Sequence, residues 1–326
     1  MCSAPCERRE LSPQPRLTRG YDAAVYGALL AGCRSFHGGL LGASRDLSDT
    51  AARLFPACGG AFVPAASESA AFDAVRLEAA GGRRTMAAAS GSALWTLLQD
   101  AERAQLPLVA LHVRTEPLHS EVVPAGGEPA IVLAPASPQE LADLTCLAFD
   151  LAERHRRPAV VVVDPFLGQM VEPVSLPCVT CERRRGATSC AIPLDRPAIG
   201  AAITRWDESE TADADVLLVS WGSAARALPR VLALGRAEGL RLGLLRPITL
   251  APFPSARLAH LASRAGDVVL LEPVSGPWSD AVRTAVGARA PVTVVEAARG
   301  PGLLSAEEIL AAVRSLPLSR GRLRYA

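Results

Sequence analysis

The chain has 326 residues, enough for about two domains that each bury a core. Its net charge of +1 excludes the strongly basic character that is typical of nucleic-acid-binding proteins. The sequence has no apolar run as long as a membrane-spanning segment. All 34 basic residues are arginine, so neither a Schiff-base lysine nor a phosphate-loop lysine belongs to its chemistry. Only 4% of the residues are aromatic, and we therefore expect helices that pack closely through small side chains.

Residues 1–18 contain prolines, cysteines and arginines but no apolar segment, which predicts a flexible tail and not a secretory signal. We accordingly expect a cytoplasmic protein without a membrane anchor. Its eight cysteines would then be thiols or metal ligands and not disulfides.

Residues 19–175 alternate between helical and strand patterns. Helices are predicted at residues 23–31, 47–54, 70–80, 95–104 and 138–154, and strands at 61–64, 85–89, 108–113, 131–134 and 159–163. Continuous apolar strands such as Ala159–Val163 are typical of a parallel sheet that is buried on both faces. The alternation predicts a doubly wound α/β domain.

A second α/β unit follows an interruption. Residues 176–205 are rich in Pro, Cys, Arg and Gly, and we interpret them as an interdomain linker. Residues 206–326 resume the pattern, with strands at 216–220, 241–245, 268–271 and 292–295 and helices at 224–238, 255–264, 278–286 and 305–315. The predicted fold class is therefore α/β with two doubly wound domains.

Glu68 is the leading candidate for a catalytic residue. Ser67 has the residue type of an N-cap, and the apolar spacing after it predicts a helix that Glu68 opens. An acid at the start of a helix that follows a strand lies where open α/β sheets bind ligands. The alternative is that Glu68 only complements the dipole of its helix.

Several segments carry a family resemblance through their order along the chain. They are residues 20–39, 67–91, 106–117, 134–164, 216–228, 245–254 and 298–310. This series resembles the α subunit of the 2-oxoacid:ferredoxin oxidoreductases, and the resemblance covers residues 19–315. It implies a pyrimidine-binding-type domain for thiamine diphosphate at residues 19–175. A transketolase C-terminal-like domain would follow at residues 206–326.

The resemblance implies an oxidoreductase subunit that is active only with a partner chain. Family enzymes decarboxylate 2-oxoacids such as pyruvate or 2-oxoglutarate on thiamine diphosphate, pass electrons through iron–sulfur clusters to ferredoxin, and form acyl-coenzyme A. A GDG…N motif for Mg²⁺-diphosphate and ferredoxin-like cysteine runs are absent from this chain. A β-type partner would therefore carry the diphosphate half-site and the clusters, while this chain would bind the aminopyrimidine.

By the same resemblance, Glu68 faces the pyrimidine ring, where its carboxylate favours the imino tautomer of the cofactor. Ser90-Gly91 matches the turn that approaches the cofactor. Arg114 matches an arginine for the anionic groups of the oxoacid or of coenzyme A. A family threonine that contacts the substrate carboxylate falls on Gly42, which has no hydroxyl, so Ser44 (or His37, which also lies close in sequence) is the candidate to replace it.

Cysteines in the linker offer a further site. Cys178, Cys181 and Cys190 include a Cys-x2-Cys spacing that suits zinc bound by thiolates. The alternative is a set of unlinked reduced thiols.

Two other functions stay open at this point. The departures from the family pattern at residues 36–47 and after Arg114 favour a degenerate structural subunit that has lost turnover. The second-domain segments also resemble those of other thiamine diphosphate enzymes, such as transketolase-like or dehydrogenase subunits. The sequence does not indicate which 2-oxoacid would be the substrate.

Overall fold

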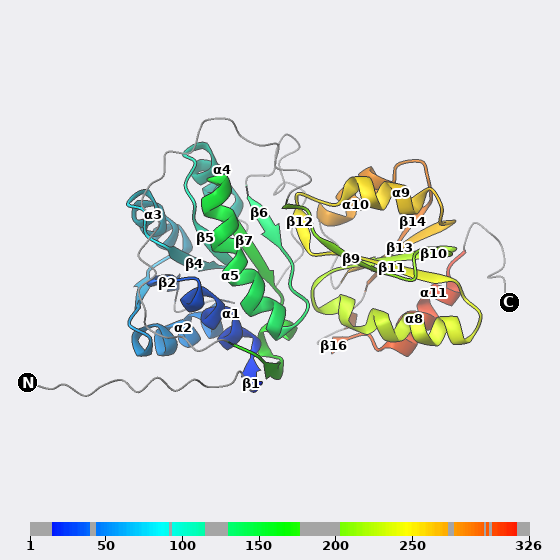
Figure 1. The fold of residues 1–326 in the computed structure, drawn as a ribbon, viewed down its shortest axis with the longest axis horizontal. Helices are drawn as coiled ribbons and strands as arrows, with labels where there is room; N and C mark the ends of the chain where they lie inside the picture. Colours follow the sequence, from blue (N-terminus) through cyan, green and yellow to red (C-terminus); the bar gives the residue numbers. More distant parts are fainter. Residues whose placement is uncertain are drawn as a thin grey trace, which may run out of the picture.

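The fold consists of two α/β units built on separate sheets (Figure 1). Each unit, a sheet together with the helices on its two faces, is called a layer. The structure, a computed structural model, describes residues 15–39, 44–90, 93–114, 130–176, 203–272, 277–296, 298–299 and 302–317. Within these residues the two main sheets have seven and five strands. This architecture confirms the α/β class predicted from the sequence.

The larger sheet is parallel except at one edge. Its order is β12 (Thr249–Ala251), β6 (Ile131–Leu133), β7 (Ala159–Val163), β5 (Val109–Val113), β4 (Thr85–Ala89), β2 (Ser35–Gly39) and β3 (Ala61–Ala65). Only β12 pairs antiparallel within this sheet, along β6. The strands β4, β5 and β7 are buried throughout, which explains their unbroken apolar sequences.

Helices cover both faces of the larger sheet. One face packs against α1 (Gly20–Leu30), α2 (Arg45–Ala57) and α5 (Pro138–His155), and the other against α3 (Glu68–Ala80) and α4 (Ala93–Arg103). The helices α1 and α5 approach closely, because a Cβ atom on Gly27 would lie 2.2 Å from the carbonyl oxygen of Ala142. This contact confirms the expected packing through small side chains.

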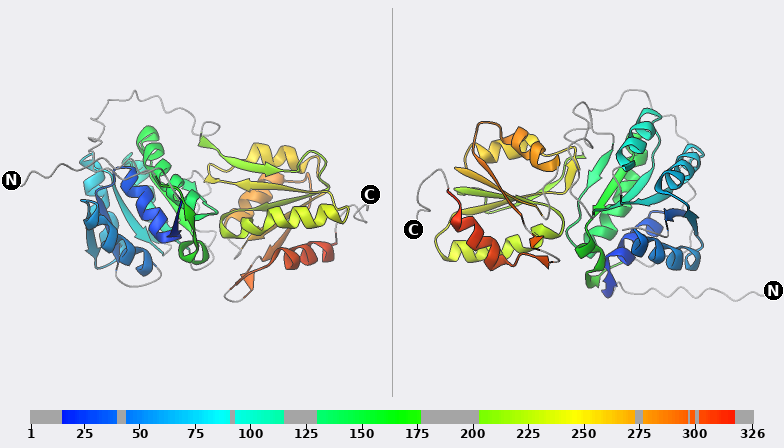
Figure 2. Two further views of the ribbon diagram at one scale, coloured as in Figure 1. Left: turned by 60° about the horizontal axis from the view of Figure 1, so that its bottom comes forward. Right: turned by 180° about the vertical axis from the view of Figure 1, so that it is seen from behind.

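The smaller sheet repeats this plan (Figure 2). Its order is β14 (Val292–Glu296), β13 (Asp267–Glu272), β10 (Val216–Ser220), β11 (Leu242–Pro247) and β9 (Trp206–Ser209), with β9 antiparallel. One face carries α8 (Leu228–Ala237) and α11 (Ala306–Ser315), and the other carries α9 (Ser255–Ala262) and α10 (Pro277–Val286). A 3-10 helix (Gly222–Ala227) follows β10.

Several short elements differ from the sequence-based prediction. The strand β1 (Arg16–Arg19) pairs with β8 (Val171–Val174), so residues 16–18 belong to a β-ribbon and not to a free tail. The helix α6 (Pro165–Gln169) and the strand pair β15 (Ala298–Arg299) and β16 (Gly302–Leu303) were also not predicted. The strand β2 was missed because its sequence SFHGG combines two glycines with a histidine, a poor strand signal.

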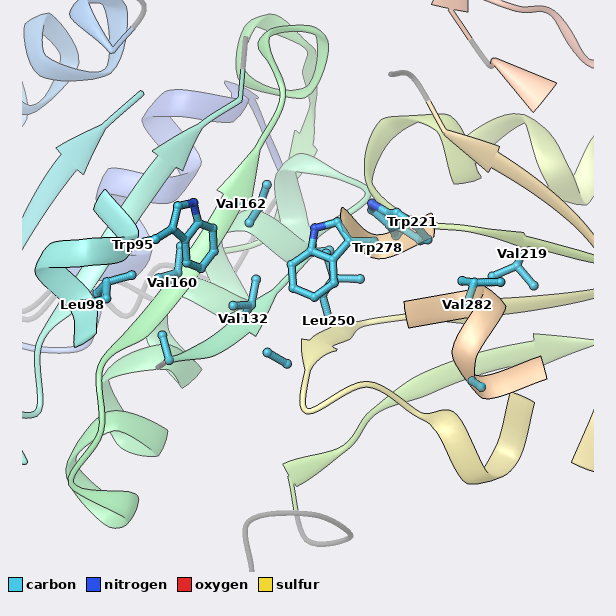
Figure 3. Packing of buried hydrophobic residues seen from close by; sticks show 14 of the residues in the cluster. Trp95, Leu98, Val132, Val160, Val162, Val219, Trp221, Leu250, Trp278 and Val282 are labelled. Atoms are coloured by element: carbon cyan, nitrogen blue, oxygen red, sulfur yellow. The ribbon is translucent and has the colours of Figure 1, made fainter. Parts of the chain in front are cut away.

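A single hydrophobic cluster joins the two sheets. It combines the α3 and α4 face of the larger sheet with the α9 and α10 face of the smaller one. Figure 3 shows Trp278 beside Leu250 of β12, with Trp95 on the side of the larger sheet and Trp221 on the side of the smaller one. The strand β12 lies in the stretch assigned to the second domain but pairs with β6. The two layers therefore share a core and an edge strand.

A polar network reinforces this junction. The guanidinium of Arg246 donates two hydrogen bonds of 2.8 Å to the carboxylate of Glu140, at the start of α5, and also binds Asp207 of β9. Ser137 caps α5 by accepting a hydrogen bond from the N–H of Glu140 at 3.1 Å.

Among the described helices, none has the length and apolar character needed to cross a membrane.

Candidate active site

Four of the predicted site residues lie at the carboxyl edge of neighbouring strands in the larger sheet. Ser44 follows β2, Ser90 follows β4 and Arg114 follows β5, while Glu68 opens the helix after β3. Because these strands are adjacent and parallel, their carboxyl ends meet at one edge. This is the edge at which open α/β sheets bind ligands. Gly42 and Gly91 lie outside the described residues, so their roles stay predictions.

The start of α3 positions Glu68. Ser67 is extended, and its hydroxyl accepts the N–H of Ala70 at 3.1 Å, which confirms the predicted N-cap. The cap makes Glu68 the first residue of the helix. Its half-buried carboxylate therefore lies at the positive end of the helix dipole.

Glu68 and Ser90 contact each other directly. The Oε1 atom of Glu68 accepts the backbone N–H of Ser90 at 2.6 Å and its hydroxyl at 2.9 Å. Two donors on one oxygen hold the carboxylate in a defined orientation at the end of β4. The structure thus brings together two residues that the sequence nominated separately.

Ser44 and His37 differ in what they contact. Ser44 is buried at the start of α2, where its carbonyl accepts the N–H of Ser48 at 3.0 Å. His37 lies within β2, and its Nε2 atom is 3.3 Å from a carboxylate oxygen of Glu78. Glu78 lies ten residues after Glu68 on the same helix, which corresponds to about 15 Å along its axis. His37 therefore faces the distal half of α3, away from the start of that helix.

Arg114 lies where the two layers meet. Its backbone N–H donates to Val163 at 2.8 Å, and its side chain is buried. Burial lowers the pKa of this guanidinium, while the negative charges of Glu272 and Asp164 act in the opposite direction. An arginine stays charged even so. The predicted anion-binding residue thus feels the negative charge of two carboxylates, one from each layer.

Asp164 links the layers through hydrogen bonds. Its Oδ1 atom accepts the N–H of Leu167 at 2.9 Å and caps α6, while Oδ2 accepts the N–H of Ser223 at 3.2 Å. Gly222 has a φ of 63°, and a Cβ atom there would lie 3.4 Å from Oδ2. Sequence reasoning missed this role, although an Asp-Pro pair directly after an apolar strand is an N-cap signal.

Glu272 is a second site residue that the sequence analysis missed. It ends β13, is fully buried and accepts a hydrogen bond from the Ser279 hydroxyl near the start of α10. A carboxylate at the end of an otherwise apolar strand was the available signal.

His112 on β5 is the register partner of Ala89, the residue before Ser90. It is buried, and its ring packs edge-on against Trp95 with 5.9 Å between the ring centroids. Burial, with a smaller contribution from the Arg114 charge, lowers the pKa of His112 to about 4. The imidazole is therefore neutral at physiological pH.

Metal binding cannot be assigned to the described part of the chain. There, no three His, Cys, Asp or Glu side chains are grouped as ligands for an ion. Cys178, Cys181 and Cys190 all lie outside the described residues, so the zinc site stays a prediction.

Family profiles match most of the chain. Residues 44–205 match "Pyruvate flavodoxin/ferredoxin oxidoreductase, thiamine diP-bdg", and residues 214–308 match "Pyruvate:ferredoxin oxidoreductase core domain II".

Curated relatives agree with these profiles. The chain is 33% identical to the ketoisovalerate oxidoreductase subunit VorB of Methanothermobacter thermautotrophicus, over 92% of this chain and 97% of that one. It is 28% identical to the 2-oxoglutarate synthase subunit KorA of the same organism, over 78% and 86% of the two chains.

Solved structures support the same fold. A 2-oxoglutarate:ferredoxin oxidoreductase from Magnetococcus marinus, with 2-oxoglutarate, coenzyme A and succinyl-CoA bound, superposes with a TM-score of 0.76 at 19% identity. The match covers 92% of this chain and 65% of that one, so our chain spans about two thirds of its length. A split-gene transketolase, an inactive β4 tetramer, gives a TM-score of 0.58 at 17% identity over 90% and 96% of the chains. The identity to VorB over nearly full length shows that this chain belongs to the 2-oxoacid:ferredoxin oxidoreductase family and is an oxidoreductase subunit.

Proposed function

We propose that this chain supplies the aminopyrimidine half of a thiamine diphosphate site for the oxidative decarboxylation of a 2-oxoacid to acyl-coenzyme A. The observation that carries the proposal is the carboxylate of Glu68, which Ser90 orients at the carboxyl edge of the larger sheet. The carboxylate fits the cofactor, because a protonated nitrogen of the pyrimidine ring requires a hydrogen-bond acceptor. The cofactor, when bound, supplies the carbon nucleophile and the electron sink.

Four residues of the candidate site each have a role in the proposed reaction. Glu68 holds a proton at the ring nitrogen of the pyrimidine, and Ser90 keeps the carboxylate oriented toward it. Arg114 binds the carboxylate of the oxoacid, and its burial strengthens that electrostatic contact. Ser44 takes the place of the family threonine.

A partner chain completes the proposed enzyme. It would bind Mg²⁺-diphosphate and carry the iron–sulfur clusters that reduce ferredoxin, since the present sequence has no motif for either. The relatives act on ketoisovalerate and on 2-oxoglutarate by their names. A 2-oxoacid is therefore the proposed substrate class.

Substitution of Glu68 tests this proposal. Glu68→Gln removes the negative charge that holds the ring proton, and we expect it to abolish oxoacid-dependent reduction of a dye acceptor by the assembled complex. Asp73→Asn, at an exposed position of the same helix, is the matched control and should leave turnover unchanged. Similar turnover in the Glu68→Gln complex would refute the proposed role.

A degenerate, non-catalytic subunit is the second candidate function, favoured by the glycine at position 42. In a working site that lacks one hydrogen bond to the carboxylate, Gly42→Thr should lower the KM for the oxoacid by roughly 10- to 150-fold. If Ser44 already makes that contact, Ser44→Ala is the damaging change instead. A wild-type complex without oxoacid activity, whose kinetics neither variant alters, would establish the degenerate subunit.

A further inference from the structure

The carboxyl edges of the two sheets meet around Arg114. The backbone N–H of Arg114 donates to Val163 at 2.8 Å, and the next residue, Asp164, accepts the N–H of Ser223 at 3.2 Å. Ser223 lies in the 3-10 helix after β10, and β10 pairs in parallel with β13, which ends at Glu272. These contacts place Arg114 and Glu272 at one junction between the layers.

Two further arginines at this junction are already neutralised by carboxylates. Arg246 ion-pairs with Glu140 and Asp207, and Arg226 ion-pairs with Glu172. The chain contains no lysine that could replace them. In the described part of the junction, Arg114 is therefore the cation that can bind a substrate anion.

Carboxylates outnumber this cation at the strand ends. Glu68 opens the helix after β3, Asp164 follows β7 and Glu272 ends β13. The negative charges of Glu272 and Asp164 act on the guanidinium of Arg114 and oppose the lowering of its pKa by burial. The same attraction favours the ionised form of both carboxylates. Arg114 can therefore balance one substrate carboxylate but not two.

The surroundings of Glu272 are apolar. Its carboxylate is fully buried and accepts a hydrogen bond from the Ser279 hydroxyl. Trp278 precedes Ser279, Trp221 follows β10, and both indoles are buried in the hydrophobic cluster that joins the layers (Figure 3). Water screens a charge there much less than at the surface, so a second anion beside Glu272 would be strongly repelled.

We infer that the oxoacid of this enzyme is a monocarboxylate with an apolar side chain, and that Glu272 selects against a second carboxylate. Arg114 binds the carboxylate next to the oxo group, which every 2-oxoacid carries. A dicarboxylate such as 2-oxoglutarate brings a second negative charge toward the buried carboxylates and indoles of the junction. The inference rests on the proposed function, because it names the substrate class of that site.

The alternative is that Arg45 binds a second carboxylate. Arg45 is the first residue of α2 and follows Ser44. Its side chain is largely exposed and lies 3.5 Å from Asp49 of the same helix. An exposed guanidinium contributes little to an ion pair, because water screens it. This alternative predicts the opposite substrate preference.

Two acids of matched shape test the substrate class. In 5-methyl-2-oxohexanoate, called the isopropyl acid, an isopropyl group stands where 2-oxoglutarate has its second carboxylate, so the two acids differ in charge and hardly in size. For the assembled complex we expect kcat/KM to favour the isopropyl acid by about 100-fold, because like charges brought together are strongly repelled. Equal values, or a preference for 2-oxoglutarate, overturn the inference.

Variants of Glu272 test the selecting residue. Glu272→Gln keeps the shape and an acceptor for Ser279 but removes the charge, and should raise kcat/KM for 2-oxoglutarate about tenfold relative to the isopropyl acid, mainly through KM. Glu296→Gln is the matched control, because Glu296 is the register partner of Glu272 at the end of β14 but is exposed. Glu272→Met should give the same rise and covers the case in which the glutamine variant does not fold. An unchanged ratio in a folded Glu272 variant overturns its role.

A binding measurement separates this inference from the proposed function. The melting temperature of the assembled complex, recorded without coenzyme A or an electron acceptor, rises with any ligand that binds the folded state. We expect a rise with the isopropyl acid and none with 2-oxoglutarate at the same concentration. A complex that turns over neither acid refutes the proposed function, whereas the melting temperatures still decide the charge preference. No rise with either acid, or a larger rise with 2-oxoglutarate, overturns the inference.

Discussion

One oxygen of Glu68 accepts both the backbone N–H of Ser90, at 2.6 Å, and its hydroxyl, at 2.9 Å. The two residues are 22 positions apart in the sequence. They meet because β3 and β4 flank β2 in the same parallel sheet, so the start of α3 lies beside the end of β4. The contact ties the first turn of the helix to the sheet edge where we place the reaction.

The contact should be measurable as a coupling energy. Ser90→Ala removes the hydroxyl donor, and we expect the free energy of unfolding to fall by about 1 kcal/mol, because the bond is charge-assisted but half-exposed. In a Glu68→Gln background the same substitution should cost less. Urea unfolding of the double-mutant cycle checks this, with Ser69→Ala at the adjacent exposed position as control. Fully additive effects would show that the Ser90 hydroxyl is not energetically coupled to the Glu68 carboxylate.

Stability should depend on pH through His112. Its pKa is lowered from 6.5 to about 4 in the folded chain, so between these values the unfolded chain binds a proton that the folded chain does not. The contribution of His112 to the free energy of unfolding is therefore at its maximum above pH 6.5. It decreases as the pH falls toward 4, by about 3 kcal/mol in total. Unfolding of wild type and His112→Gln across this range checks the prediction. The variant should show a flatter dependence, and parallel curves would contradict it.

The junction between the layers should depend on Arg246. This arginine is largely buried, whereas its partners Glu140 and Asp207 are more exposed, so the network lies between a surface pair and a buried one. We expect Arg246→Leu to lower the free energy of unfolding by about 2 kcal/mol. The exposed Arg103–Asp100 pair supplies the control, since Arg103→Leu should change it by less than about 0.5 kcal/mol. Equal effects of the two substitutions would argue against the network.

The packing of α1 on α5 should leave no room for a methyl group at Gly27. Alanine is favoured over glycine in a helix by about 1 kcal/mol, but a Cβ on Gly27 would lie 2.2 Å from the Ala142 oxygen. Overpacking then dominates, and Gly27→Ala should destabilise the chain by about 2 kcal/mol. Gly81→Ala, at an exposed helix end with a φ of −78°, should stay within about 1 kcal/mol of wild type. The melting temperatures of the two variants check this prediction. If Gly27→Ala were more stable than wild type, the two helices would separate easily to admit the methyl group.

Local patterns were sufficient for most of the helices and buried strands. The period of apolar residues predicted α3, α5 and the strands β4, β5 and β7 near their observed bounds. Ser67 was correctly identified as a cap, because an N-cap depends on residues only three positions away. The elements that were missed, such as β2 and β12, are stabilised mainly by their neighbours in the sheet.

The candidate site could be predicted only in part. Glu68, Ser90 and Arg114 were nominated from the sequence, and three strand ends in one parallel sheet account for their common edge. The sequence analysis did not identify Asp164, Glu272 and His112 as site residues. A charged or polar residue at a strand end can have many roles, and the sequence pattern does not distinguish them.

The sequence by itself determined the α/β class, the family and the position of Glu68 at the start of a helix, because periodicity, caps and motifs are local properties of the chain. Only the tertiary structure decided that β12 joins the larger sheet and that the charges of Glu272 and Asp164, one from each layer, act on Arg114. It alone placed His112 opposite Ala89, the residue before the serine that donates to Glu68. These contacts join residues far apart in the sequence, and their partners are selected by sheet order and burial, which no local pattern encodes.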